Sequence, residues 1–133
     1  MTSPMLQKLL LIGLAGALGT LARYGLDGFV QLFISPDRRG LFPWGIVVVN
    51  LLGCLAFGIL VSMFEGRWAV RNDTRTVLLT GLLGGFTTFS TYIFEWTGML
   101  QDKEWLAAAG NFSLHNIGGL VAMAVGLILG RLL

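Results

Sequence analysis

Four long apolar stretches, separated by short polar segments, account for most of the chain. A helix needs about 20 apolar residues to cross the hydrocarbon core of a bilayer, which is roughly 30 Å thick. The pattern therefore predicts an all-α membrane protein whose short connections make neighbouring helices antiparallel. We predict a single four-helix transmembrane domain over residues 1–133, with spans at Leu6–Ile34, Phe42–Phe64, Thr76–Leu100 and Trp105–Leu132.

The composition agrees with a membrane location and argues against other classes of protein. Of the 133 residues, 55% are hydrophobic and only 12% are charged, whereas soluble domains carry about 25% charged residues. The first stretch lacks a cleavage-like small-residue site before a soluble chain, so we expect it to stay as a helix. Cys54 is the only cysteine, which excludes an intrachain disulfide. We expect neither an enzyme nor a nucleic-acid-binding protein, because the chain lacks a phosphate loop, a nucleophile elbow, metal-ligand spacing and a clustered basic patch.

The third stretch contains a run that suits a lipid-facing helix poorly. Residues Gly84–Tyr92 read GGFTTFSTY, with two glycines, four Ser or Thr hydroxyls and three aromatic rings. In hydrocarbon, each unsatisfied backbone group costs several kcal/mol, so irregular backbone persists there only when it faces protein, water or an ion. We therefore predict that the third helix is broken near its middle and that the break lies at a permeation or ion site.

The distribution of positive charge predicts how the chain inserts into the membrane. Positive residues favour the cytoplasmic side, and the two sides differ little: Lys8, Arg67, Arg71, Arg75 and Arg131 lie on the side of the termini, and Arg38, Arg39 and Lys103 on the other. So small a bias predicts insertion in both orientations and an antiparallel homodimer. The alternative is a single orientation with both termini in the cytoplasm.

Glycines are expected to mark contacts between helices. The chain has 19 of them, and small residues let membrane helices approach closely. The candidates are Gly13, Gly16 and Gly19 in the first span, Gly81 and Gly85 in the third, and Gly118, Gly126 and Gly130 in the fourth. Four thin helices do not enclose an aqueous pore, so any conduction pathway is expected at an oligomer interface.

Polar residues inside the first two spans have two interpretations each. Arg23 and Asp27 are one helical turn apart and share a face, so they either pair or leave Arg23 to attract anions into a vestibule. Nearby glycines suggest that the first helix ends close to them. Asn50 stands in an apolar segment, where its amide either donates to a dehydrated anion or makes an interhelical hydrogen bond.

The later spans add further candidates. Thr88, Thr91 and Glu95 fall on one helix face, and Phe89 and Tyr92 line the adjacent face. Aromatic ring edges carry partial positive charge and attract anions weakly. In the fourth span, His115 has three possible roles: a proton relay, a member of a hydrogen-bonded line along a pathway, or a packing group. A zinc site is not expected, because His115 has no second His or Cys at ligand spacing.

Three motifs in this order resemble the Fluc family of fluoride channels, also called CrcB proteins. They are Gly19–Tyr24 (GTLARY), Asn50–Gly53 (NLLG) and Gly84–Thr91 (GGFTTFST), the last followed by Glu95. The resemblance extends over essentially the whole chain. It implies a passive, selective fluoride channel in the inner membrane that exports fluoride before it becomes toxic. It also implies a dual-topology antiparallel homodimer in the lipid bilayer, with two pores and a structural Na⁺ at the dimer centre.

The resemblance assigns roles to individual residues. Asn50 matches the pore asparagine, Phe89 the first aromatic of a box beside the pore, and Arg23 the vestibule arginine. Gly84 and Thr87 match positions whose backbone carbonyls hold sodium. Tyr92 replaces a usual phenylalanine, and its hydroxyl either donates to fluoride or binds it too strongly for fast passage. Thr91 and Glu95 match part of a polar track, and His115 falls near fourth-span positions where the family commonly has small hydroxyl residues. Ser90 and Thr91 are hydroxyl donors by their own chemistry.

Two other functions fit a small four-span protein. A dual-topology proton-coupled multidrug or cation transporter needs a titratable carboxylate in a central cavity, for which Glu95 is a candidate. A membrane scaffold protein would use the glycines and polar groups only for packing, which leaves the hydroxyl-rich run unexplained.

Overall fold

The structure is a computed structural model that describes residues 3–34, 42–66 and 70–133. Within these ranges the chain is helical apart from short connections and ends. The charge comparison also used Arg38, Arg39 and Arg67, which lie outside the described residues.

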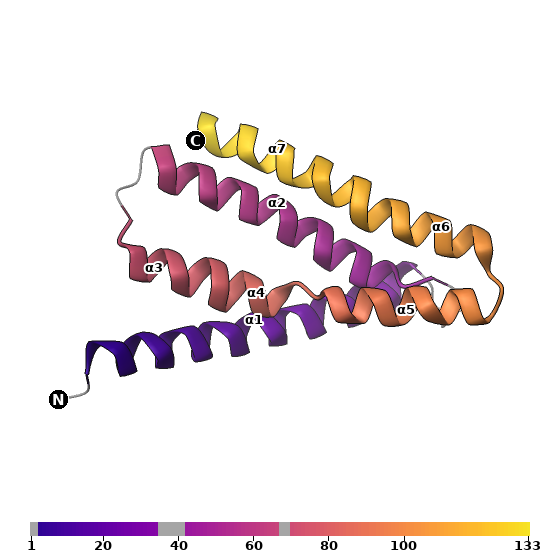
Figure 1. The fold of residues 1–133 in the computed structure, drawn as a ribbon, viewed down its shortest axis with the longest axis horizontal. Coiled ribbons are helices and arrows are strands. Elements are labelled where there is room, and N and C mark those ends of the chain that lie inside the picture. Colours follow the sequence, from indigo (N-terminus) through magenta and orange to yellow (C-terminus); the bar gives the residue numbers. More distant parts are fainter. Residues whose placement is uncertain (1–2, 35–41, 67–69) are drawn as a thin grey trace.

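The prediction of four spans is confirmed. The described residues contain four helical segments long and apolar enough to cross a membrane: Pro4–Ile34, Trp44–Gly66, Asn72–Gln101 and Trp105–Leu132. Both termini lie at one end of the molecule, together with the end of the second span and the start of the third (Figure 1). The turn between the third and fourth spans lies at the opposite end, so this architecture is a multi-pass antiparallel arrangement (Figure 1).

The first two spans are continuous helices, whereas the last two change geometry along their length. The first two are α1 (Pro4–Ile34) and α2 (Trp44–Gly66). The third comprises α3 (Asn72–Thr76), the π-helical segment η1 (Val77–Leu83), α4 (Gly84–Phe86) and α5 (Phe89–Gln101); the fourth comprises α6 (Trp105–Ser113), the π-helical segment η2 (Leu114–Gly118) and α7 (Gly119–Leu132). α1 continues through Gly25 and Gly28, so the expected helix end there was wrong.

Glycines bring two pairs of helices into backbone contact. A Cβ atom on Gly126 of α7 would overlap the carbonyl oxygen of Leu55 on α2. A Cβ atom on Gly85 of α4 would overlap the carbonyl oxygen of Gly16 on α1. The expected packing role therefore holds for these glycines, but a Cβ on Gly13 would meet nothing within 4 Å. The first contact holds α2 against the fourth span, and the second holds α1 against the third span.

Gly126→Ala is expected to destabilise the protein by about 1–3 kcal/mol, the usual cost of forcing extra volume into a packed interface. The added methyl group would separate α7 from α2 near Leu55. Gly13→Ala is the matched control, because it adds the same methyl group where space is open. Thermal denaturation of the purified variants in one detergent compares them. Equal melting temperatures for the two variants would contradict the role given to Gly126.

Candidate functional site

The candidate site is built around two residues with extended backbone between α4 and α5. Thr87 has φ −83° and ψ 156°, and Thr88 has φ −148° and ψ 116°. Thr88 is the N-cap of α5, and its Oγ1 accepts a hydrogen bond from the Thr91 backbone N–H at 3.3 Å. Threonine suits this position because its hydroxyl satisfies an N–H that has no partner within the helix. Thr87 and Thr88 therefore end one helix and begin the next.

Asn50 of α2 satisfies both backbone polar groups of Thr88. The Asn50 Nδ2 donates to the Thr88 carbonyl oxygen at 3.0 Å, and the Thr88 N–H donates to Asn50 Oδ1 at 2.8 Å. These two bonds fix the orientation of the amide, because its nitrogen donates and its oxygen accepts. Of the two roles considered for Asn50, the structure shows the interhelical one. The Nδ2 group retains a second N–H that this pair does not use.

The same arrangement leaves carbonyl groups before the break without their usual helical donors. In a continuous α-helix, the Thr88 N–H would donate to the Gly84 carbonyl oxygen and the Thr91 N–H to that of Thr87. Here the Thr88 N–H donates to Asn50 and the Thr91 N–H donates to the Thr88 hydroxyl. The carbonyls of Gly84 and Thr87, the residues expected to hold sodium, are therefore among those that the break leaves without helical donors. Carbonyl oxygens are suitable ligands for a hard cation.

Hydroxyl groups gather at the start of α5. The Thr88 Oγ1 lies 3.0 Å from Thr91 Oγ1 and 3.4 Å from Ser90 Oγ. Ser90 is exposed, whereas Thr88 is buried. The three hydroxyls can reorient together, because each both donates and accepts. The cluster therefore offers O–H donors beside the Asn50 amide.

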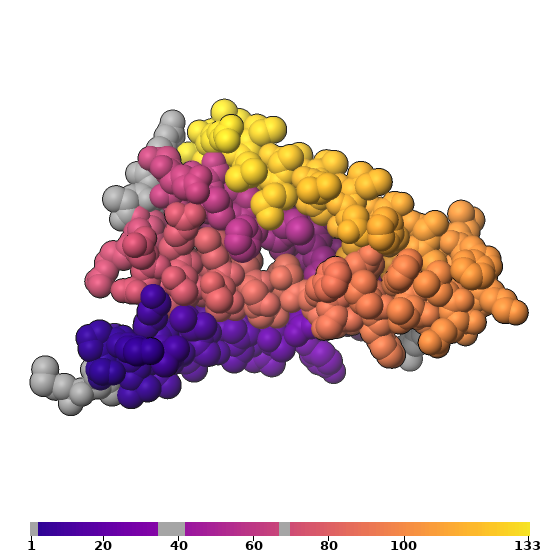
Figure 2. Space-filling view, viewed as in Figure 1, coloured from indigo at the N-terminus to yellow at the C-terminus, as the bar shows by residue number. Residues whose placement is uncertain are grey.

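A cavity of about 250 Å³ opens at this point, which we call the junction cavity. Its wall includes residues of α2, the α4–α5 connection, the start of α5, η2 and α7: Asn50, Gly53, Cys54, Phe57, Thr87, Thr88, Phe89, Tyr92, His115, Asn116 and Met123. In Figure 2, α2 is visible at the bottom of the hollow between the α4–α5 connection and the fourth span. The junction cavity brings together four of the predicted pore residues: Asn50, Phe89, Tyr92 and His115.

Aromatic rings form one wall of the junction cavity. Phe89 is 72% exposed, and its ring meets that of Tyr92 edge-on with centroids 5.6 Å apart. Tyr92 is only 2% exposed and stacks on the His115 ring at 4.2 Å. The Asn116 Nδ2 donates to the Tyr92 hydroxyl oxygen at 3.0 Å. Tyr92 is thus held by two rings and at its hydroxyl, whereas Phe89 projects from the chain.

His115 connects the junction cavity to a buried polar group. Its Nδ1 lies 3.1 Å from the Asn111 carbonyl oxygen one turn earlier, and its Nε2 is buried. The Asn111 side chain is fully buried and donates to the Met99 sulfur at 3.8 Å. The structure therefore places His115 on the cavity wall and also packs its ring against Tyr92.

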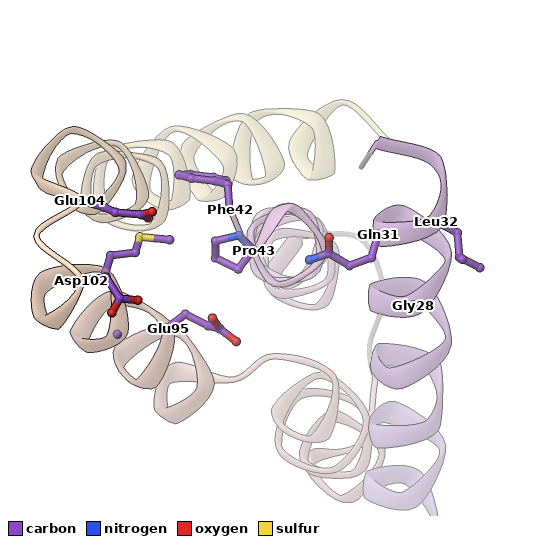
Figure 3. Close-up of a pocket in the computed structure, with 10 residues that line it drawn as sticks. Gly28, Gln31, Leu32, Phe42, Pro43, Glu95, Asp102 and Glu104 are labelled. Carbon is purple, nitrogen blue, oxygen red and sulfur yellow. The ribbon is translucent and has the colours of Figure 1, made fainter. Parts of the chain in front are cut away.

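Glu95 lies in a different cavity from the other pore candidates. This second cavity, of about 520 Å³, also includes Gln31, Pro43, Asp102 and Glu104 in its wall. In Figure 3, the carboxylates of Glu95, Asp102 and Glu104 surround the gap beside Pro43, and Gln31 approaches it from α1. The structure therefore does not bring Glu95 to the junction cavity.

Arg23 and Asp27 do not form one of the ion pairs found among the described residues. Those pairs join Lys8 to Asp73 at 2.9 Å, Arg71 to Asp73 at 3.8 Å and Arg75 to Glu65 at 3.3 Å. Asp27 instead packs against Gly45 in the first turn of α2, where the positive end of the helix dipole favours a carboxylate. The pairing considered for Arg23 and Asp27 was therefore wrong. Arg23 is half-buried and lies outside the junction cavity.

A family model described as "CrcB-like protein, Camphor Resistance (CrcB)" matches residues 10–127. The chain belongs to the CrcB family. It is 51% identical over 130 residues to the "Fluoride-specific ion channel FluC" of Desulforapulum autotrophicum, and 50% identical over 129 residues to the protein of that name from Solidesulfovibrio magneticus. The FluC protein of Nitrosococcus oceani is 44% identical over 129 residues. Each match covers 97% of this chain and 100% of the relative.

In this member of the CrcB family, two residues that were given no role in the pore are central to the geometry. Thr88 links Asn50 to the hydroxyl cluster, and Asn116 holds the Tyr92 hydroxyl. The sequence placed Thr88 on one helix face with Thr91, but that spacing gave no sign of its bonds to Asn50, 38 positions away. The role of Asn116 could not be read from its sequence neighbours, because its partner Tyr92 lies 24 positions away. Only the tertiary packing brings the two side chains together.

Proposed function

We propose that this CrcB-family protein is a passive, selective fluoride channel of the cell's inner membrane, which exports fluoride and so protects the cytoplasm. Relatives of equal length that are up to 51% identical carry the name fluoride-specific ion channel. The observation that carries the proposal is the junction cavity, where the Asn50 amide, Thr88 and aromatic rings meet at interrupted backbone. This chemistry suits a small anion, and the wall includes no Lys or Arg side chain that would hold the ion tightly.

The junction cavity supplies replacements for the water around fluoride. A selectivity filter conducts when its groups compensate for dehydration without holding the ion too tightly. In its wall, Asn50 offers its second amide N–H and the Phe89 ring offers a weakly positive edge. Ser90 and Thr91 are outside the set of residues that line the cavity, but their hydroxyls contact Thr88 in its wall and offer further donors beside it. Larger halides are rejected because they do not fit the narrow path. Arg23, which has no ion-pair partner among the described residues, raises the local fluoride concentration at the entrance.

The proposed functional unit is an antiparallel homodimer with two pores, each protomer being a single transmembrane domain with a discontinuous third span. Three observations support it. The junction cavity opens outward, Phe89 beside it is 72% exposed, and α1 and α7 carry exposed leucines such as Leu21 and Leu120. A second, inverted copy would cover the open side of the junction cavity, and lipid would cover the outer apolar faces. Epitope tags at each terminus, read from both sides of the membrane, test the dual orientation.

We assign Na⁺ as a structural ion held by the Gly84 and Thr87 carbonyl oxygens of both copies. The hydrogen bonds around Thr88 support this, because they leave these carbonyls without their helical donors. When bound, Na⁺ supplies positive charge to carbonyl groups that would otherwise be unsatisfied in hydrocarbon. The candidate ligands come from the backbone; no cluster of His, Cys, Asp or Glu suited to a metal is found among the described residues.

Removing Na⁺ is expected to lower the melting temperature of the dimer. An ion that binds only the folded state raises the free energy of unfolding, and the increase grows with the logarithm of the ratio of the ion concentration to its Kd. The purified protein is melted in NaCl and in N-methylglucamine chloride at equal ionic strength, and the dimer fraction is followed by size-exclusion chromatography. Identical melting curves and dimer fractions in both salts would contradict the assigned ion.

Fluoride efflux from liposomes tests the proposed function. Vesicles containing KF and the protein should release fluoride rapidly when valinomycin allows K⁺ to follow, and vesicles containing KCl should retain chloride. Release that instead requires a pH gradient would favour the proton-coupled transporter, for which Glu95 in its acidic cavity is the candidate carboxylate. Fluoride retention equal to that of protein-free vesicles would refute the channel.

A further inference from the structure

The hydrogen bonds of Asn116 determine which way the Tyr92 hydroxyl points its proton. The Asn116 Nδ2 donates to the Phe112 carbonyl oxygen at 2.8 Å and to the Tyr92 hydroxyl oxygen at 3.0 Å. A carbonyl oxygen only accepts, so the amide atom beside Phe112 must be the nitrogen. That nitrogen has two protons and no acceptor capacity. The Tyr92 oxygen is therefore the acceptor, and its own proton is not used in this contact.

The Tyr92 ring has little freedom to turn away from this arrangement. Its faces and edges contact His115 and Phe89, with centroids at 4.2 and 5.6 Å, and the residue is 2% exposed. Among the described residues, no acceptor for the Tyr92 O–H proton is found. Accepting a hydrogen bond from Asn116 polarises the phenol and strengthens it as a donor. Both Tyr92 and Asn116 lie in the wall of the junction cavity.

From this geometry we propose that the Tyr92 hydroxyl is a fluoride donor in the junction cavity and that Asn116 is its positioning residue. This inference rests on the proposed channel function and adds a binding group to it. Asn116 does not contact the ion; it occupies the phenol oxygen so that the proton is directed to the anion. Because the donor is neutral, it binds fluoride without the electrostatic attraction of a cation.

A mutant cycle tests the inference through the fluoride concentration that gives half-maximal efflux. Tyr92→Phe is expected to raise this concentration about tenfold, since it removes one hydrogen bond to a charged partner. Asn116→Leu, which keeps the side-chain volume, is expected to raise it about threefold, because the hydroxyl remains but is no longer oriented. In the Tyr92→Phe background, Asn116→Leu should produce no further rise, whereas a merely structural role for Asn116 would reduce efflux in both backgrounds.

The chain provides a matched control and a second readout. Tyr24 is the only other tyrosine and is 81% exposed on α1, so Tyr24→Phe should leave efflux unchanged. In that variant the phenol C–O band in the infrared spectrum reports Tyr92 alone, and added fluoride should shift it toward the position of a donating hydroxyl. Chloride should not shift it, and Asn116→Leu should diminish the fluoride effect.

The outcomes distinguish this inference from the proposed function. The Tyr92 inference is wrong if Tyr92→Phe has the half-maximal fluoride concentration of the wild type and fluoride leaves the phenol band unchanged. The channel function still stands in that case, provided that the wild-type protein conducts fluoride. Additive effects of the two substitutions would overturn the positioning role of Asn116. A wild-type protein that passes no fluoride would refute the channel itself.

Discussion

Asn50→Leu is expected to abolish fluoride efflux and also to lower the melting temperature of the protein. The leucine would remove both hydrogen bonds to Thr88. An unsatisfied buried backbone group costs about 1–3 kcal/mol, and here the N–H and the C=O of one residue lose their partners together. The connection between α4 and α5 would then shift to find other partners, and the junction cavity would lose its shape. Liposome efflux and thermal denaturation measure the two effects.

Two other variants show whether the hydrogen bonds are the cause. Leu52→Ala removes side-chain volume from an exposed position on the same helix, where the residue is 44% accessible, and should change neither property greatly. Asn50→Asp keeps an acceptor for the Thr88 N–H but loses the donor to its carbonyl, so its stability should fall between those of Asn50→Leu and the wild type. A fully stable Asn50→Leu protein would show that Thr88 does not depend on Asn50.

Phe89→Ile is expected to reduce fluoride efflux at least tenfold while changing stability little. The ring is 72% exposed in one copy, and its loss removes a single edge-on contact with Tyr92, worth about 0.5–1.5 kcal/mol. Isoleucine retains much of the volume but has no positively polarised ring edge to face an anion. Efflux rates and melting temperatures of the same preparations separate conduction from folding.

Phe94→Ile is the matched control, because Phe94 lies on the same helix and is 74% exposed. It should conduct like the wild type if aromatic character matters only beside the junction cavity. Equal rates for Phe89→Ile and wild type, with both proteins dimeric, would remove Phe89 from the pathway. Equal losses for Phe89→Ile and Phe94→Ile would point to a general packing effect.

The sequence predicts the spans well because burial in lipid imposes a simple requirement on each helix. About 20 consecutive apolar residues leave little ambiguity, and the boundaries predicted for the four spans agree with the helices to within a few residues. Small residues also indicate close helix contacts, but the pattern does not separate Gly16, which meets the third span, from Gly13, which does not. That distinction depends on the rotation of α1 about its axis.

The site was harder to predict because its hydrogen bonds join distant parts of the chain. Asn50 was recognised as a costly buried amide, but its partner Thr88 lies 38 positions away. Two amide roles were consistent with the sequence until that partner was known. Similarly, Arg23 and Asp27 have the spacing of a helical ion pair, but the start of α2 offers Asp27 a competing contact at Gly45. Local spacing therefore identified the polar residues without identifying what each one contacts.

The central claim is that the junction cavity conducts fluoride and excludes other halides. Its most direct test is the reversal potential of the wild-type protein in a planar bilayer with KF on one side and KCl at equal concentration on the other. The account predicts a stable current that reverses far from zero, near the limit set by fluoride permeation alone. A reversal potential near zero, which indicates equal passage of fluoride and chloride, would contradict it.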